Sequence, residues 1–539
     1  MKRTGLATNG QSLHTATPAL VAAGVAIVLY AVLLGGGFAY DFYGITRNDT
    51  HLRRPSEWAA YWADSYNGGV DNLYRPLTST AFAIQAYFNG IDDRAAWKFH
   101  LLSLLEHAGV CALVAELTRR LVGWRAAMIA GLLYSVHPIH VEVLGDIVGQ
   151  AEMMCATGML GAMVLILRRP MTLARVVAIF LCFILALLSK EQGMLLPGLL
   201  LILVLCLRFR RVESAAGETA QLPREVLSYS SLHTTRWEQR EKLAWQWLVV
   251  LLCFGLGGYI FVRENILHLK FWWDRGFLDP AINPMVLSHG EDRLLMPLVL
   301  LGRYTHLLIC PWKLAPDYSA LAIGWVVRIN DPYLFLGGIA VLAWLALCAI
   351  AIHRRASAML FCLVALAITY GLVGNIVTII GTNFAERLMY LPSVFFVMLI
   401  AMGLTKLRTR VVAPILILIL VLASIRTVTY ARRWNDRATL YEQAIRDQPG
   451  AVRMYMALAT EYLERNQPER AIATIQTAQQ IMPDYAKIWS YSAALAIKTG
   501  DLSLARQYLQ RAEQIDPRQA MGVWEQLKEA EATTRPANP

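Results

Sequence analysis

A single carboxylate stands at the end of an uncharged apolar segment near the N-terminus. The stretch ALVAAGVAIVLYAVLLGGG (19–37) carries no charge, and FAYDFYGITRN (38–48) follows it directly. The aromatic neighbours of Asp41 in this stretch are Phe38, Tyr40, Phe42 and Tyr43. Such a collar would partly desolvate the carboxylate and make it a stronger base, which suits general-base catalysis of transfer to a hydroxyl group. The alternative of a solvated acid at a helix end stays open at this point.

A second group of polar residues lies in HPIHVEVLGDIVGQAE (137–152), between two apolar segments. Its candidate site residues are His137, His140, Glu142, Asp146 and Glu152. Two histidines and a carboxylate at this spacing can ligate a divalent metal, but His-x-x-His-x-Glu is a weak pattern. A polar network that shapes a pocket is favoured. We therefore predict no resident metal and no cofactor, and leave a divalent metal open.

Cations that could hold a phosphate flank the same apolar segments. Lys190 and Glu191 stand in LLSKEQGMLLP, and Arg75 stands in LYRPL. Arg387 follows Glu386 in AERLMYLP. A guanidinium fork or an ammonium group at a membrane boundary suits the phosphate oxygens of a lipid-linked donor, although such charges can also snorkel or pair with each other. The sequence has no Walker loop or Gly-x-Gly-x-x-Gly unit, which disfavours a nucleotide-binding enzyme.

The elements that must position these residues are membrane helices. The chain has 539 residues, of which 56% are hydrophobic and 17% charged, and its mean hydropathy is +0.42. This composition is typical of an integral membrane protein and not of a soluble globular one. The formal net charge of +11 indicates Lys and Arg in cytoplasmic loops. Nucleic-acid binding is disfavoured, because no basic run is interleaved with aromatic residues.

Apolar segments of about 20 residues, the length that crosses a bilayer, recur about twelve times. They lie near 18–39, 99–118, 125–144, 147–167, 171–189, 192–207, 245–262, 294–312, 333–352, 357–380, 388–404 and 411–427. Positive clusters such as those at Arg119, Arg208 and Arg354 are expected in the cytoplasm. Alternation from an inside N-terminus then predicts about eleven crossings. The remaining segment, 294–312, would enter and leave on one face.

The sequence becomes polar and helix-forming from about residue 435. Pro449, Pro483 and Pro517 recur every 34 residues, the period of the tetratricopeptide repeat. The positions expected at the helix contacts of the first repeat are Tyr455, Leu458, Ala459, Tyr462, Ala471, Ile475 and Ala478. We therefore predict an all-α chain with a polytopic membrane bundle over 1–430 and a repeat domain over 435–531. So short an array should pack on the outer loops or be capped by 519–531.

This topology collects the candidate residues on one side of the membrane. The segments expected on the outer face are 40–97, 137–152, 189–193, 263–332 and 381–390. We therefore predict a multi-pass cell-membrane protein whose active site and C-terminal repeats are extracytoplasmic. Arginines that follow the last span, such as Arg426 and Arg432, support the alternative of an inside C-terminus.

Several blocks of the sequence, in order, resemble one known family. The blocks are YDFYGITRND, YRPLTSTAFAI, FHLLSLLEH, HPIHVEVLGDIVGQAEMM, SKEQGMLLPGLLL, PWKLAPDYS and NFAERLMYLPS. Followed by the repeats, they are similar to the transmembrane and tetratricopeptide repeat-containing O-mannosyltransferases and their prokaryotic relatives. The resemblance implies a GT-C glycosyltransferase bundle and a lipid-phosphate-linked monosaccharide as donor. It also implies that an acid in the first outer loop is the general base, and Asp41 occupies that position.

The sequence departs from the family pattern at two places. The family usually has two adjacent acids in the first outer loop, whereas Phe42 follows Asp41 here. The Arg-Ala-Asp that usually follows the HPxHxE block is replaced by Gln150, Ala151 and Glu152. Both departures bear on which sugar is transferred.

We therefore expect transfer of a mannose-like monosaccharide from a polyprenyl phosphate to a hydroxyl acceptor, Ser or Thr of an exported protein. In this hypothesis Asp41 is the base, and the donor phosphate is held by Arg75, Lys190 and Arg387. The pocket is shaped by His137, His140, Glu142, Asp146, Glu152, Glu191 and Glu386. The expected partners are the lipid-linked donor, a polypeptide docked by the repeats and membrane lipids, without nucleic acid. The alternative is a non-catalytic, membrane-anchored tetratricopeptide scaffold for protein–protein interaction.

Overall fold

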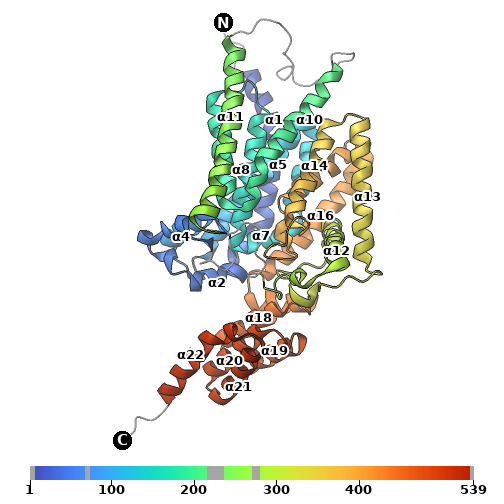
Figure 1. The fold of residues 1–539 in the computed structure, drawn as a ribbon. Helices are drawn as coiled ribbons and strands as arrows, with labels where there is room; N and C mark the ends of the chain where they lie inside the picture. The colour runs from blue at the N-terminus through green and yellow to red at the C-terminus, as the bar shows by residue number, and fades with distance from the viewer. Residues whose placement is uncertain (1–5, 67–72, 215–235, 270–278, 535–539) are drawn as a thin grey trace.

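The structure is a computed structural model that describes residues 6–66, 73–214, 236–269 and 279–534. Within these ranges every regular element is a helix, and no strand is formed. Long helices make a bundle, and a layer of short C-terminal helices lies beyond the end of the bundle that carries α2 (Tyr40–Asn48) and α7 (Val141–Gly145) (Figure 1). The predicted all-α fold class is confirmed.

Seven helices in the described part of the chain are long and apolar enough to cross a membrane. They are Ala16–Gly35, Ala96–Leu121, Ile147–Ile166, Glu191–Arg208, Glu238–Ile266, Pro332–His353 and Thr409–Arg433. A pair bent by 52°, Trp124–Val136 and Pro138–Gly145, would make an eighth span. Three shorter apolar helices are Leu173–Ser189, Ser357–Val373 and Pro392–Leu404. Each falls on a segment expected from hydropathy, so a multi-pass bundle is confirmed, while the count of about eleven crossings stays a prediction.

α12 (Gly290–Ile309), the segment predicted to enter and leave on one face, packs along α13 (Pro332–His353). An added Cβ at Gly302 would lie 1.9 Å from the carbonyl oxygen of Tyr333, so only glycine allows these backbones to meet. Small residues at helix contacts are typical of membrane bundles. The guanidinium of Arg303 lies 4.5 Å from the centre of the Tyr333 ring, so this charge faces the partner helix. The re-entrant path of α12 stays a prediction.

The segment between the first two spans folds into short helices at one end of the bundle (Figure 1). α2 (Tyr40–Asn48) follows the first span directly, and α4 (Pro76–Asn89) lies further along the same segment. Phe42 from α2 and Phe82 from α4 are buried, with 5.0 Å between their ring centres. Burial of this aromatic pair holds the two helices together and so fixes where α2 begins.

The C-terminal helices form antiparallel pairs of the tetratricopeptide type. The helices in order are α17 (Arg437–Asp447), α18 (Val452–Glu464), α19 (Pro468–Ile481), α20 (Ala486–Thr499), α21 (Leu502–Ile515) and α22 (Pro517–Thr534). All positions predicted at the helix contacts of the first repeat are buried: Tyr455, Leu458, Ala459, Tyr462, Ala471, Ile475 and Ala478. α22 packs on α20 and α21 and so caps the short array, as predicted.

The repeat helices pack on the first loop. The backbone N–H of Tyr40 donates to the hydroxyl of Tyr441 at 3.1 Å, and Arg47 pairs with Glu464 at 2.7 Å. The last long helix, α16 (Thr409–Arg433), is joined to α17 through the buried Trp434. The domain limits of 1–430 and 435–531 stay a prediction, but the repeats and α2 lie at the same end of the bundle (Figure 1).

Candidate active site

Asp41 lies in the first turn of α2, where the chain leaves the first apolar span. Its neighbour Tyr40, the first residue of α2, has a left-handed backbone with φ of 53°, which turns the chain sharply at the start of the helix. Strained backbone of this kind is concentrated at functional sites. The side chain of Asp41 is 28% exposed, so most of its surface is covered while one part stays open to a substrate.

The guanidinium of Arg387 joins Asp41 to two other acids. Nη1 of Arg387 lies 3.0 Å from Oδ2 of Asp41, 3.2 Å from Oε1 of Glu142 and 3.7 Å from Oδ2 of Asp146. The backbone N–H of Arg387 also donates to Oε2 of Glu142 at 2.9 Å. Burial lowers the pKa of Arg387, but the carboxylates of Asp41 and Glu142 outweigh burial, so the pKa stays above its ordinary value. The cation is therefore permanent.

Asp146 contacts the backbone of Phe42, the position at which the similar family usually has a second acid. Oδ1 of Asp146 accepts from the backbone N–H of Phe42 at 3.2 Å and from that of Val148 at 3.3 Å. Burial raises the pKa of Asp146 well above its ordinary value, and the carboxylate of Asp41 raises it further. Both effects favour the protonated form of Asp146.

The side chain of Phe42 points away from these acids. Its ring is fully buried and lies 5.2 Å from the ring of Phe38 and 5.7 Å from that of Phe99. A carboxylate at this position would be buried among aromatic rings without a cation, at a large cost in free energy. The departure from the family pattern at Phe42 therefore fits the aromatic core beneath α2.

The other predicted cations form a second group, each paired with an acid. Arg75 binds Glu191 through two nitrogens, with distances of 3.0 and 2.7 Å to Oε2. Lys190 pairs with Glu152. Burial lowers the pKa of Lys190, and the carboxylate of Glu152 opposes this shift. The guanidiniums of Arg75 and Arg387 add to the lowering, so the two groups of charges are near enough to interact.

Two buried polar atoms of the site, the hydroxyl of Tyr66 and Oε2 of Glu152, have no hydrogen bond among the described residues. Oε1 of Glu142, Oδ2 of Asp146 and Nη1 of Arg387 also lack a hydrogen bond there, but they form ion pairs with one another. Buried polar atoms are nearly always satisfied in folded proteins, so the first two atoms indicate a place for a polar ligand or water. Tyr66 is only 6% exposed.

Tyr66 connects the two groups of charges. Burial raises the pKa of its hydroxyl, and Arg75 opposes the shift. Asp146, Asp41 and Glu152 raise this pKa further, so the hydroxyl lies within the electrostatic reach of both groups. The arrangement can therefore present a base, several cations and a neutral hydrogen-bond donor to one ligand.

The two histidines and Glu386 support the surrounding structure. Nδ1 of His137 accepts from the backbone N–H of Ile139 at 3.3 Å, and Nδ1 of His140 lies 3.0 Å from the carbonyl oxygen of Tyr134. Oε1 of Glu386 accepts from the backbone N–H of Ala315 at 2.8 Å and from the Tyr318 hydroxyl at 2.7 Å. Within the described ranges, no group of three or more His, Cys, Asp or Glu side chains is arranged to hold a metal ion.

Two residues of the site were missed by the sequence analysis. Nη2 of Arg453, from α18, lies 3.5 Å from Oδ1 of Asp41, and its Nη1 lies 3.3 Å from Oδ1 of Asp317. Asp317 belongs to the block PWKLAPDYS, which carries part of the family resemblance, so a signal for it existed. Arg453 lies in the repeats, where an arginine on a helix surface gives no signal.

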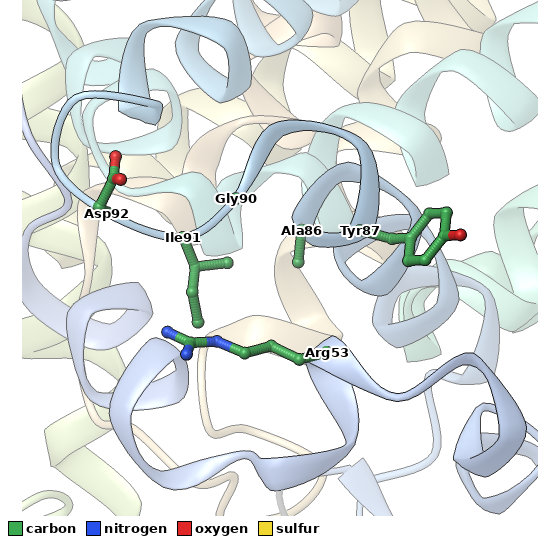
Figure 2. Close-up of a pocket in the computed structure, with 6 residues that line it drawn as sticks. All are labelled: Arg53, Ala86, Tyr87, Gly90, Ile91 and Asp92. Carbon is green, nitrogen blue, oxygen red and sulfur yellow. The ribbon is translucent and has the colours of Figure 1, made fainter.

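A separate pocket of about 390 Å³ opens on the surface of the first-loop layer (Figure 2). Its lining residues are Arg53, Ala86, Tyr87, Gly90, Ile91 and Asp92. The side chain of Arg53 extends below Ile91, while the ring of Tyr87 points away (Figure 2). None of the predicted site residues lines this pocket, so it is distinct from the candidate active site.

Comparison with known proteins places the chain among glycosyltransferase relatives. Residues 462–522 match a tetratricopeptide repeat family. Protein O-mannosyl-transferase TMTC4 from Homo sapiens is 25% identical over 84% of this chain and 65% of its own length. Protein O-mannosyl-transferase TMTC1 from Homo sapiens is 26% identical over 93% of this chain and 59% of its own length. The chain thus spans less than two thirds of the length of these relatives.

Two solved structures are similar at low identity. ArnT from Cupriavidus metallidurans bound to undecaprenyl phosphate has a TM-score of 0.41 and 14% identity, over 90% of this chain and 78% of that chain. The Archaeoglobus fulgidus oligosaccharyltransferase tethered to an acceptor peptide has a TM-score of 0.38 and 11% identity, over 84% of this chain and 58% of that chain. The resemblance predicted from the sequence is confirmed by the curated relatives: the homologues of this chain are protein O-mannosyl-transferases, and its C-terminal part carries a tetratricopeptide repeat.

Proposed function

We propose that this protein is a membrane glycosyltransferase. It moves a mannose-like monosaccharide from a polyprenyl-phosphate donor to a hydroxyl group, that of Ser or Thr in an exported protein. The observation that carries the proposal is the partly exposed Asp41 in contact with Arg387, in a site where the buried hydroxyl of Tyr66 has no hydrogen bond among the described residues. The names of the relatives support mannose as the sugar and a protein as the acceptor.

In the proposed step Asp41 is the general base. The acceptor oxygen forms a bond to the anomeric carbon of the sugar while the bond from that carbon to the phosphate oxygen breaks. The hydroxyl proton moves to Asp41, and the polyprenyl phosphate leaves with the bonding electrons, which inverts the configuration of the sugar. The step needs no nucleotide, because the lipid phosphate is itself the leaving group.

Cations at the site would stabilise the leaving phosphate. Arg387 contacts Asp41 at 3.0 Å, so the base and a phosphate-binding group are neighbours. Arg75 and Lys190 are held in place by Glu191 and Glu152, which orients their charges before the donor arrives. The hydroxyl of Tyr66, which has no hydrogen bond within the described residues, is suited to donate one to the phosphate or to the sugar.

We assign the site and the repeats to the extracytoplasmic face. The repeats contact α2 directly, so one orientation applies to both. Exported proteins and lipid-linked sugars meet on that face, and the repeat helices offer a surface on which an acceptor polypeptide could dock.

The base assignment is tested with Asp41→Asn in proteoliposomes that contain a panel of polyprenyl-phosphate sugars and an exported-protein acceptor. We expect turnover to fall by about 10²–10⁴-fold, since the amide cannot accept the proton. The matched control is Asp64→Asn, an exposed acid of the same loop that hydrogen-bonds only to the adjacent Ser65 among the described residues. Near-normal turnover of Asp41→Asn would contradict the assignment.

The same preparation separates an enzyme from a scaffold. A glycosyltransferase binds the polyprenyl-phosphate sugar, whereas a scaffold has no reason to bind it. If the purified wild-type protein neither binds nor consumes any donor of the panel, the scaffold alternative is favoured.

A further inference from the structure

We infer that the repeat domain completes the active site by supplying Arg453, which positions the carboxylate of Asp41. This inference rests on the proposed function, because it assigns a role in the same transfer step. It makes the repeats part of the catalytic unit in addition to any role in docking an acceptor.

The guanidinium of Arg453 contacts three groups: Asp41, Asp317 and the hydroxyl of Tyr40. Its Nη2 lies 3.5 Å from Oδ1 of Asp41. Its Nη1 lies 3.3 Å from Oδ1 of Asp317 and donates to the hydroxyl of Tyr40 at 3.2 Å. The Tyr40 hydroxyl in turn donates to Asp317 at 3.2 Å. Asp41 is thus held from two sides, by Arg387 on Oδ2 and by Arg453 on Oδ1.

The aromatic ring of Tyr40 lies near both arginines. The guanidinium of Arg387 lies 5.8 Å from the ring centre, and that of Arg453 lies 5.6 Å from it. Both distances are within the range of cation–π attraction. Tyr40, whose backbone is left-handed, therefore presents its ring to an arginine of the membrane domain and to an arginine of the repeats, immediately before the base.

The position of Arg453 beside Asp41 is set by the local structure at the start of α18. Arg453 stands in the first turn of α18, directly after a tight approach of Gly450 to the membrane domain. An added Cβ at Gly450 would lie 2.4 Å from the carbonyl carbon of Leu321. Lys487 pairs with Asp279 at 3.1 Å and anchors the next repeat to the same outer segment. The start of α18 is therefore held against the loop that contains Asp317.

A simpler role for Arg453 would be to neutralise Asp317, whose side chain is only 5% exposed. That role needs only one nitrogen of the guanidinium, whereas the fork of Arg453 also reaches Asp41. A guanidinium that contacts two carboxylates through different nitrogens fixes the orientation of both carboxylates. A single ammonium charge does not fix them in this way. The two roles predict different outcomes when Asp317 is also neutralised.

The test uses the full-length protein in proteoliposomes with the donor that the wild type consumes. For Arg453→Ala we expect kcat to fall by about 10²-fold, as is typical when a reacting group is misplaced. Millimolar guanidinium ion should restore part of kcat, because Arg453 is 29% exposed and its place is accessible from water. Arg453→Lys should retain more kcat than the alanine variant, since it keeps the charge but loses the fork.

Lys487→Ala is the matched control, because it also removes a cation that links the repeats to an outer aspartate but does not touch Asp41. It should keep the kcat of the wild type and should not respond to guanidinium. Equal losses in Arg453→Ala and Lys487→Ala, or a wild-type kcat in Arg453→Ala, would overturn the inference. So would full recovery of kcat in Arg453→Ala with Asp317→Asn, because neutralisation of Asp317 would then explain Arg453.

The experiment distinguishes failure of the proposed function from failure of the inference on Arg453. If the wild type consumes no lipid-linked sugar, the function and the inference fall together. If the wild type is active and Arg453→Ala is equally active, only the inference falls.

Discussion

The three acids around Arg387 differ in how open they are, and this difference singles out the base. The side chains of Glu142 and Asp146 are 0% and 1% exposed, whereas that of Asp41 is 28% exposed. An acceptor hydroxyl can reach only the exposed acid. Asp146 contacts the same arginine as Asp41, and burial raises the pKa of Asp146, which favours its protonated form. At the scale of residues, access and burial therefore assign different roles to neighbouring carboxyl groups.

Tyr66→Phe tests whether the free hydroxyl at the site meets the donor. A hydrogen bond to a charged group is worth about 1.5–3 kcal/mol, so we expect the donor KM to rise by about tenfold or more. The thermal stability should stay the same or increase, because the variant removes a buried hydroxyl that has no hydrogen bond in the described part of the protein. Donor KM is measured from initial rates and stability from the melting temperature.

Tyr74→Phe is the control for this prediction. Tyr74 is also buried in the first loop, but its hydroxyl donates to the carbonyl oxygen of Trp62 at 3.0 Å. Its loss should cost about 1 kcal/mol of stability and leave the donor KM unchanged. An unchanged donor KM in Tyr66→Phe would show that its hydroxyl does not contact the donor.

At the scale of elements, a glycine just before α18 allows the backbone to approach the membrane domain closely. A Cβ at Gly450 would lie 2.4 Å from the carbonyl carbon of Leu321 and 2.5 Å from the nitrogen of Ala322. Gly450→Ala should therefore weaken the contact by about 1–3 kcal/mol, as overpacking does in other close contacts. We expect faster proteolysis between residues 430 and 437 and a lower kcat.

Gly522→Ala provides the comparison for that variant. Gly522 lies in α22, where an added Cβ would meet nothing within 4 Å. The change should leave kcat unaltered and raise stability by about 0.5–1 kcal/mol, because alanine favours a helix more than glycine does. If Gly450→Ala behaved in the same way, the close approach at α18 would have no role.

The helices could be predicted from the sequence more fully than the contacts between them. Each apolar segment expected from hydropathy coincides with a helix, because hydropathy and helix length are local properties. The bend of 52° between Trp124–Val136 and Pro138–Gly145 interrupts a segment that hydropathy treats as one. The break falls at His137, where an X-Pro step disfavours continued helix.

At the scale of the whole molecule, the repeats lie at the end of the bundle that carries the candidate site. They lie away from the end of α10 (Leu196–Ser214) and the start of α11 (Arg236–Phe261) (Figure 1). Reporter proteins that are active only outside the cytoplasm test the proposed orientation. We expect activity for a fusion after residue 531 and none for a fusion after Arg354, which lies in a predicted cytoplasmic turn. Activity for the second fusion alone would reverse the assignment of sides.

The sequence by itself determined the membrane character, the all-α class and the repeats, since composition, hydropathy and a 34-residue period are readable in short windows. It also identified Asp41, Lys190 and Arg387 as unusual charges beside apolar segments. Only the tertiary structure decided which acids share Arg387, that Arg75 and Lys190 are paired, and that the hydroxyl of Tyr66 has no hydrogen bond among the described residues.

The contact between Arg453 and the first loop joins residues that are 413 positions apart. No local pattern contains that information, because the contact depends on how the repeat domain packs on the bundle. An arginine on a polar helix has the same appearance in sequence whether it faces water or a catalytic acid. The physical reason is that charges act through short distances in space, and those distances are set by the packing of elements far apart in the chain.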